Sequence, residues 1–350
     1  MELSSELQAS QTRSKSAGLR LTLFLSVFLV LASSCDEGEK VLPAFSGQAS
    51  EVVIVMKDVH WNGDAGRLMK EMLYTAFPYL PQAEPSFDII HQTPKDLSYN
   101  LRLHRNLIFV DIEDNARNSP TRAVRKESQW SKGQVVYTFH SLDEQGFIEK
   151  FKEVGTTVLD DIRRQDRKRH QDYLRKVEHA LIGKQLQDEM GLDLLVHQEY
   201  KLHTISKDFA WMTRERIQYL SGVGHDVVQG IAIYVRPYTS DSIFDPESLM
   251  EYRNERLADH VISRYDEPMR VEPLIPPSYE QVEFGENYAI EGRGLWRMER
   301  PIMGGPYVSL TVVDEENARV ITVDGYVFAP KFDKRNYLLD VEAIVYSLDF

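Results

Sequence analysis

The residue pair best suited to acid–base chemistry is His60 with Asp64, which follows the apolar run 52–56 and has Trp61 beside it. An imidazole held by a carboxylate can take up and return a proton near neutral pH. These residues are equally compatible with an ordinary surface loop, and we favour that interpretation. We therefore predict no catalytic residue here and keep His60 and Trp61 as candidates for a binding surface.

Other signatures of catalysis or metal binding are weak. His197 and His203 are six residues apart, which could place both on one face of a strand, but half-buried structural histidines are the simpler interpretation. The sequence has no phosphate-binding loop, no nucleophile elbow and no His-Glu-x-x-His motif. We predict no metal and no cofactor, and a non-enzymatic protein is favoured.

Two glycine-containing motifs near the C-terminus are more distinctive, at residues 292–298 (GRGLWRM) and 303–309 (MGGPYVS). Trp296 and Tyr307 are residue types that stack on sugar rings or anchor protein interfaces, and Arg293 stands between two glycines. We place Arg293, Trp296 and Tyr307 on a candidate binding surface. The simpler interpretation, which we favour, is that Trp296 packs in the core and Gly304–Pro306 joins two strands.

Cys35 is the single cysteine, so no intramolecular disulfide and no cysteine-based zinc site can form. Basic residues precede the apolar run 21–32, which as a helix would rise only about 18 Å against the ~30 Å of a bilayer core. That length is typical of a signal peptide. Residues 31–35 (LASSC) resemble the bacterial lipobox, in which the cysteine is acylated, although Ala32 stands where Leu or Val is commoner. The alternative is a buried free cysteine behind an interfacial helix.

Composition argues against a nucleic-acid partner, because a formal charge of −13 repels the phosphate backbone. The chain has 350 residues and 42% hydrophobic residues, which is enough for a large core. Acidic residues directly after Cys35 fit either a solvated linker or a routing signal for the outer membrane.

Alternating strand and helix patterns predict an α+β fold of two tandem ferredoxin-like modules, the second with a helical and Pro-rich insertion from residue 246 to 277. The windows 90–99 and 202–211 align at His, Lys and Asp, which suggests an internal repeat. Residues 163–172 (RRQDRKRHQD) contain no apolar side chain and predict a solvated linker or exposed helix. The expected organisation is a signal peptide (1–34), a tether (35–50), a first module (51–165) and a second module (166–350).

Several of these segments together resemble a family of Bacteroidota lipoproteins known as a domain of unknown function. The resemblance rests on residues 293–296, 303–309, 325–330, 334–335 and 237–242, with Trp61, Gly63, Gly66 and residues 80–85 near the N-terminus. It implies lipidation at Cys35 and a place in the cell envelope. It implies no activity, substrate or catalytic residue.

We therefore expect an outer-membrane lipoprotein, facing the periplasm or the cell surface, which binds or assembles with a protein or glycan partner. The alternative is a hydrolase or transferase acting on cell-envelope polymers, with His60, Asp64 and the 293–307 segments lining one cleft. These hypotheses differ in whether the candidate residues converge on one concave surface.

Overall fold

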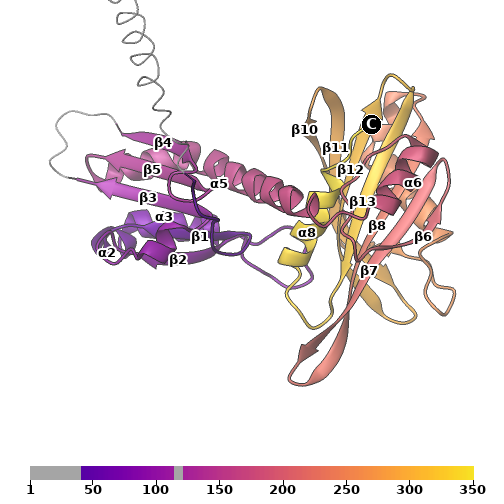
Figure 1. The fold of residues 1–350 in the computed structure, drawn as a ribbon, viewed down its shortest axis with the longest axis horizontal. Coiled ribbons are helices and arrows are strands. Elements are labelled where there is room, and N and C mark those ends of the chain that lie inside the picture. The colour runs from indigo at the N-terminus through magenta and orange to yellow at the C-terminus, as the bar shows by residue number, and fades with distance from the viewer. Residues whose placement is uncertain (1–40, 114–120) are drawn as a thin grey trace, which may run out of the picture. The chain divides into compact units, whose positions relative to one another are not determined.

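The computed structural model describes residues 41–113 and 121–350. Cys35, the apolar run before it and the acidic residues directly after it lie outside the described residues. From Ala44 to Phe350 the chain forms one unit that contains two β-sheets (Figure 1). No helix within the two described ranges is long and apolar enough to cross a membrane.

The first sheet has five strands in the order β2-β1-β3-β5-β4. All neighbouring strands pair in parallel except β4, which is antiparallel to β5. Side chains of β1 alternate between two cores, because successive residues of a strand point to opposite faces. One face is covered by α3 and α5 and the other by α4 with its flanking loops. The elements are β1 (Glu51–Val55), α2 (Asp58–Trp61), α3 (Asp64–Leu73), β2 (Asp88–Gln92), α4 (Tyr99–Arg102), β3 (Asn106–Ile112), β4 (Arg122–Glu127), β5 (Val135–Ser141) and α5 (Glu144–Leu174).

The second sheet has eight strands and is antiparallel throughout, in the order β10-β11-β12-β13-β8-β7-β6, with β9 paired to β11. One face packs against α6 and α8, and the other against α7. The elements are α6 (Ala180–Met190), β6 (Lys201–Ile205), β7 (Phe209–Leu220), β8 (Val223–Pro237), the 3-10 helix η1 (Asp241–Phe244), α7 (Pro246–Ala258), β9 (Arg270–Val271), β10 (Ser278–Phe284), β11 (Asn287–Met298), β12 (Met303–Asp314), β13 (Arg319–Phe328) and α8 (Arg335–Val345).

The structure is thus a mixed α/β fold, but the predicted pair of ferredoxin-like modules is not confirmed. The first sheet is mainly parallel and the second is antiparallel, so the two halves do not repeat each other. Windows 90–99 and 202–211 illustrate the difference, because the first leads from β2 toward α4 and the second joins β6 to β7. The order of strands and helices along a chain does not reveal which strands pair or in which direction.

The polar segment 163–172 is helical, as one of the two alternatives predicted, but it lies within α5 and is not exposed throughout. Asp166 and Arg169 are both buried. The Asp166 carboxylate accepts hydrogen bonds from the guanidinium groups of Arg105 (3.0 Å) and Arg169 (2.6 Å) and from the amide of Asn106 (3.2 Å). Charged side chains tolerate burial when they are paired in this way. The boundary predicted at residues 165 and 166 falls within α5.

A second group of ion pairs, around Glu342, joins α8 to α5 and to β11. This carboxylate accepts hydrogen bonds from Arg167 of α5 (3.0 Å) and Arg293 of β11 (2.6 Å), and its side chain is 8% exposed. Gln171 of α5 also donates to the carbonyl of Ala343 (3.1 Å). Glu342 therefore links the last helix of the first module to the second sheet.

Glu342→Gln should destabilise the protein in a pH-dependent manner. Burial raises the pKa of the Glu342 carboxyl, but Arg293 and Arg167 outweigh this and lower it below its ordinary 4.5. A carboxyl with a lowered folded-state pKa stabilises the fold at higher pH, and this contribution is lost as the pH falls below about 4.5 through the folded-state pKa. We expect a loss of about 3–5 kcal/mol at pH 7 that shrinks below pH 4.5.

Urea unfolding at pH values from 7 to 3 measures this difference. Glu153→Gln, which changes an exposed carboxylate of α5, serves as the control and should have little effect at any pH. An equal deficit for Glu342→Gln at pH 7 and pH 3 would contradict the assigned role of the charge.

Candidate functional site

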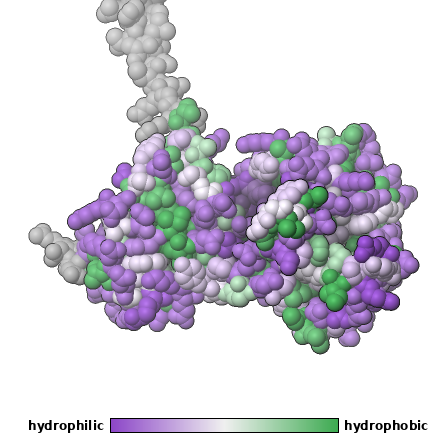
Figure 2. All heavy atoms as spheres, turned by 90° about the horizontal axis from the view of Figure 1, so that it is seen from below, coloured by the Kyte–Doolittle hydropathy of each residue, from purple (hydrophilic) through white to green (hydrophobic). Residues whose placement is uncertain are grey.

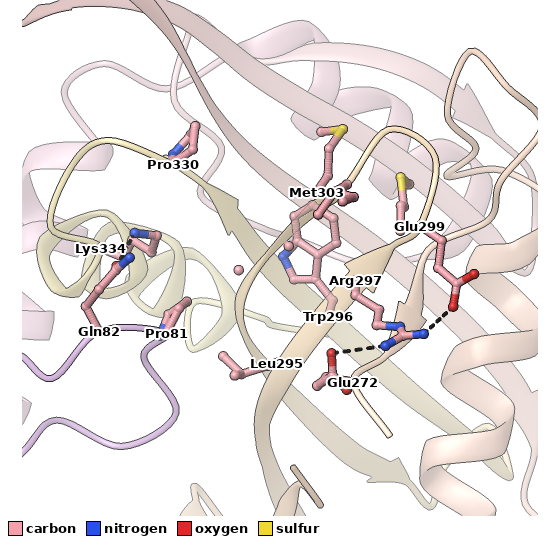
Figure 3. A pocket seen from close by; sticks show the side chains of 14 residues that line it. Pro81, Gln82, Glu272, Leu295, Trp296, Arg297, Glu299, Met303, Pro330 and Lys334 are labelled. Carbon is pink, nitrogen blue, oxygen red and sulfur yellow. Dashed lines mark hydrogen bonds and ion pairs between the residues drawn. The ribbon is translucent and has the colours of Figure 1, made fainter. Parts of the chain in front are cut away.

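A pocket of about 640 Å³ opens between the β11–β12 turn and the start of α8 (Figure 3). Its walls come from three parts of the chain: the loop after α3, the β9–β11–β12 region and the connection from β13 to α8. The lining residues are Pro81, Gln82, Glu272, Leu295, Trp296, Arg297, Met298, Glu299, Ile302, Met303, Gly304, Gly305, Pro330 and Lys334. We call this the Trp296 pocket.

Trp296 forms the floor of the pocket and is only 2% exposed. Its indole Nε1 donates to the carbonyl of Val327 (3.2 Å), and its ring packs edge-on against Tyr326 with centroids 5.7 Å apart. Gly305 pairs directly with Trp296, and a Cβ there would lie 2.0 Å from the Val327 oxygen. Glycine is therefore required for this close approach. The glycines lie inside β12 rather than joining two strands.

Two cations lie among the polar lining residues. Arg297 forms ion pairs with Glu272 (3.6 Å) and Glu299. The ammonium of Lys334 donates to the Gln82 side chain (2.7 Å) and to the carbonyl of Phe332 (3.0 Å), and Figure 3 shows these pairs on separate walls. Burial lowers the pKa of Lys334.

The rest of the lining is mostly apolar and includes a very exposed side chain. Ile302 is 93% exposed, while Leu295 and Met298 are nearly buried. The lining contains no His, Cys, Ser or Thr, and no group of His, Cys, Asp or Glu in the described ranges has the arrangement of a metal site. The arrangement is suited to holding an amphipathic ligand, because an apolar wall is combined with a few polar groups.

Tyr307 does not line the Trp296 pocket. It is fully buried on the same face of the sheet, beneath the guanidinium of Arg253, which lies 3.8 Å from its ring centroid. Arg253 is held by two hydrogen bonds to Asp324, at 2.7 and 3.0 Å. Burial raises the pKa of the Tyr307 hydroxyl. Its aromatic ring is therefore a structural contact for a buried ion pair.

Arg293 lines a different pocket, of about 390 Å³. Its guanidinium donates to Glu291 (2.6 Å) and Glu342 (2.6 Å). Burial lowers the pKa of Arg293, but these two carboxylates outweigh it and raise that pKa above its ordinary value. Arg293 thus belongs to the ion pairs that join α5, α8 and β11.

His60 and Trp61 lie in α2 of the first module. His60 Nδ1 is 3.6 Å from a Glu144 carboxylate oxygen, whereas Asp64 pairs with Arg67 on the surface, so His60 and Asp64 are not paired. The Trp61 ring stacks on His91, with centroids 4.4 Å apart, and the Lys70 ammonium lies 4.0 Å from the Trp61 ring centroid. The Trp61 ring is therefore already in contact with two side chains of the same chain, His91 and Lys70.

Of the five residues proposed for a binding surface, only Trp296 lines this pocket. Trp61 packs on the core of the first sheet, whereas Trp296 and Tyr307 belong to a core of the second. Sequence reasoning did not place Gln82, Arg297, Ile302, Met303 or Lys334 on the binding surface, although Gln82, Met303 and Lys334 lie in segments that carry the family resemblance. Arg297 and Met303 lie within the two glycine-containing motifs, so a wider use of those motifs would have included them.

Two family models match the chain. Residues 46–175 match a family described as "Domain of unknown function (DUF8532)", and residues 179–347 match "Domain of unknown function (DUF4837)". The chain therefore contains domains of unknown function, which meet just after α5. No curated protein matches the chain.

Several solved structures are similar to part of the chain. The Ran-binding protein Mog1p of Saccharomyces cerevisiae is 10% identical, with a TM-score of 0.29, over 45% of this chain and 89% of Mog1p. LpqN of Mycobacterium tuberculosis, described as involved in cell envelope biogenesis, is 14% identical, with a TM-score of 0.24, over 44% of this chain and 79% of LpqN. A protein from Bacteroides thetaiotaomicron is 8% identical, with a TM-score of 0.23, over 45% of this chain and 44% of that protein.

Asp324→Asn tests the structural role of the cluster around Tyr307. The substitution leaves the fully buried Arg253 without a counter-charge, so we expect a loss of about 3–5 kcal/mol in the free energy of unfolding. The double variant Arg253→Met with Asp324→Leu removes both charges and should be closer to wild type. Urea unfolding of the single and double variants in one cycle measures the coupling. Additive losses would show that the two side chains do not stabilise each other.

Proposed function

We propose that this chain is a lipid-anchored protein of a bacterial envelope that binds an apolar segment of a partner protein in the Trp296 pocket. The observation that carries the binding proposal is the combination of an exposed apolar wall at Ile302 with the buried ammonium of Lys334. An ammonium has three donors, and two of them are used on Gln82 and Phe332. The third is available to a carboxylate or carbonyl of the ligand.

A protein ligand fits the pocket better than a glycan. Sugar rings stack on open aromatic faces, but Trp296 and Tyr307 are buried and the Trp61 ring is already stacked on His91. The open part of the pocket instead presents aliphatic and thioether side chains at Ile302 and Met303, which favour apolar side chains. The partner segment is therefore expected to combine an apolar residue with a nearby carboxylate.

The geometry gives no support to a hydrolase or transferase of envelope polymers. That alternative requires His60, Asp64 and the 293–307 segments to line one cleft. His60 instead packs beside Glu144, and Asp64 pairs with Arg67. The Trp296 pocket contains neither of them, and its two carboxylates, Glu272 and Glu299, both form ion pairs with Arg297.

The anchoring part of the proposal rests on residues 21–35 of the sequence. A short apolar run that ends at a lipobox-like cysteine is the pattern expected for acylation of Cys35. The acidic residues that follow, and the resemblance described above, favour the outer membrane, on its periplasmic or its external face. The first described strand, β1, begins at Glu51, sixteen residues after Cys35.

A random peptide library displayed on phage tests the pocket when it is selected against the full-length protein. We expect enriched peptides to pair apolar residues with Asp or Glu. The double variant Ile302→Asp with Met303→Asp should weaken their binding by about tenfold or more, which corresponds to about 1.4 kcal/mol, in fluorescence polarisation. Leu181→Asp, which changes a 71% exposed side chain of α6, is the matched control and should leave binding intact.

Selection of no common peptide pattern, or equal binding by the pocket variant, would argue against a peptide site. Binding to a glycan array that is lost in the same pocket variant would assign the pocket to a glycan instead.

Cys35→Ala tests the anchor. In native cells the wild-type protein should sediment with the membranes, and mass spectrometry should find an acylated N-terminal cysteine. The variant should move to the soluble fraction, because the acyl chains supply the membrane affinity. Wild-type protein with a free Cys35 thiol and residues 1–34 still attached would contradict the anchor.

A further inference from the structure

The hairpin of β7 and β8 extends beyond the rest of the second sheet as a two-stranded ribbon (Figure 1). β6 pairs with β7 only as far as Thr213, and β13 pairs with β8 only from Val228 onward. Among residues 41–113 and 121–350, the register pairs from Arg216↔Val227 to Leu220↔Val223 therefore have no neighbouring strand on either side. Within the ribbon, the side chain of Gln218 accepts a hydrogen bond from the hydroxyl of Tyr337 in α8.

The tip of the ribbon is apolar and exposed. Ile217 is 64% exposed, Tyr219 71%, Leu220 46% and Val223 58%. A view from below Figure 1 shows apolar side chains on this side of the molecule (Figure 2). Four exposed apolar side chains within seven residues form a patch of the kind that marks an interaction site.

The apolar side chains lie on both faces of the tip. Ile217 and Tyr219 are two residues apart and share one face, whereas Leu220 and its cross-strand partner Val223 share the other. Gly224 lies opposite Tyr219, and a Cβ there would approach Ile217 to 2.8 Å. Glycine thus allows Ile217 and Tyr219 to cover the ribbon on their face.

The tip carries no charge. No Asp, Glu, Lys, Arg or His occurs in residues 217–224, and the nearest fully charged side chains are Arg216 and Asp226. A strand rises about 3.3 Å per residue, so these charges lie roughly 13–17 Å from the end of the hairpin. An uncharged segment of this length exceeds the 5–10 Å by which interfacial elements enter a bilayer.

We propose that the β7–β8 tip, residues 217–224, inserts into the interfacial region of a lipid bilayer. A protein surface would cover one face of the ribbon and leave the other in water, whereas lipid surrounds the tip and covers both. The absence of charge matches the low polarity of the acyl-chain boundary, and a tyrosine such as Tyr219 is favoured at that depth. The inference rests on the proposed location at a membrane. There the tip would provide a second attachment to the bilayer, in addition to the lipid on Cys35.

A fluorescent label at the tip tests the insertion. Ser221→Cys in a full-length Cys35→Ser background carries the single thiol, to which the environment-sensitive fluorophore NBD is attached. Glu316→Cys in the same background labels the exposed turn between β12 and β13 and is the matched control. With vesicles of phosphatidylethanolamine and phosphatidylglycerol, the label at 221 should shift to the blue and be quenched by nitroxide-bearing lipids, and the label at 316 should not.

A charged tip should abolish the effect. Adding Leu220→Asp with Val223→Asp to the Ser221→Cys protein places two carboxylates in the apolar region, so the blue shift and quenching should be lost. Leu181→Asp in the same protein adds a carboxylate elsewhere and should retain them. Unchanged circular dichroism and thermal unfolding of the charged-tip protein show that it is folded.

Three results would overturn the proposal: a label at 221 that keeps its aqueous spectrum with vesicles, equal quenching at 221 and 316, or protection at 221 that appears without vesicles and grows with protein concentration. The last would identify a second copy as the partner. The apolar run 21–32 can recruit the chain to vesicles, but it cannot produce quenching at 221 without quenching at 316. Because Cys35 is replaced and the Trp296 pocket is untouched, the result is separate from those of the anchor and peptide tests.

Discussion

The pocket depends on the contact between the carboxylate of Glu84, in the loop after α3, and the first backbone amides of α8. The two carboxylate oxygens accept hydrogen bonds from the backbone amides of Lys334 (2.7 Å) and Arg335 (2.9 Å), and Glu84 is buried. The first amides of a helix have no partner within the helix, and a negative charge there is favourable. Lys334 caps α8 without a side-chain hydrogen bond of its own, so a residue 250 positions earlier supplies the cap. This contact fixes the loop after α3 against α8 and brings Pro81 and Gln82 into the pocket wall.

Helix α8 is consequently held by the first module near both of its ends. Glu84 binds its N-terminus, and Glu342 in its last turns is paired with Arg167 of α5. The two regions that match separate family models are thus joined through one helix, and the Trp296 pocket takes residues from both. Removing one partner of a buried charged contact of this kind is costly, because the other charge is left uncompensated.

The sequence predicted individual elements better than their assembly. The continuous apolar runs 52–56 and 135–139 largely coincide with β1 and β5, because strands buried on both faces contain few polar residues. The exposed edge strand β4, with the sequence RAVRKE, lacks that pattern, so the sequence contains no comparable signal for it. Asp166 and Arg169 were expected in solvent because their burial depends on partners such as Arg105 and Asn106, which lie about sixty positions away.

The dependence on contacts between residues far apart in the sequence also explains which parts of the site could be predicted. Trp296 was proposed for a binding surface and packs in a core, as the alternative interpretation stated; the glycines near it indicated a close approach of chains, and Gly305 makes that approach. The contact between Lys334 and Gln82 was not predicted, because it exists only where Glu84 caps α8.

Met303 connects the pocket to the hairpin. Its side chain lines the Trp296 pocket and also a second hollow beside the β7–β8 ribbon, which includes Asp226, Phe328 and Ile217, the first residue of the tip. The pocket and the ribbon differ in the number of charged groups that they carry. Ion pairs and a buried ammonium line the pocket, whereas the ribbon loses all charge beyond Arg216 and Asp226. The Trp296 pocket, beside the root of the ribbon, is therefore suited to a ligand that makes directional polar contacts. The tip, residues 217–224, is suited only to surroundings that need no such contacts, such as lipid.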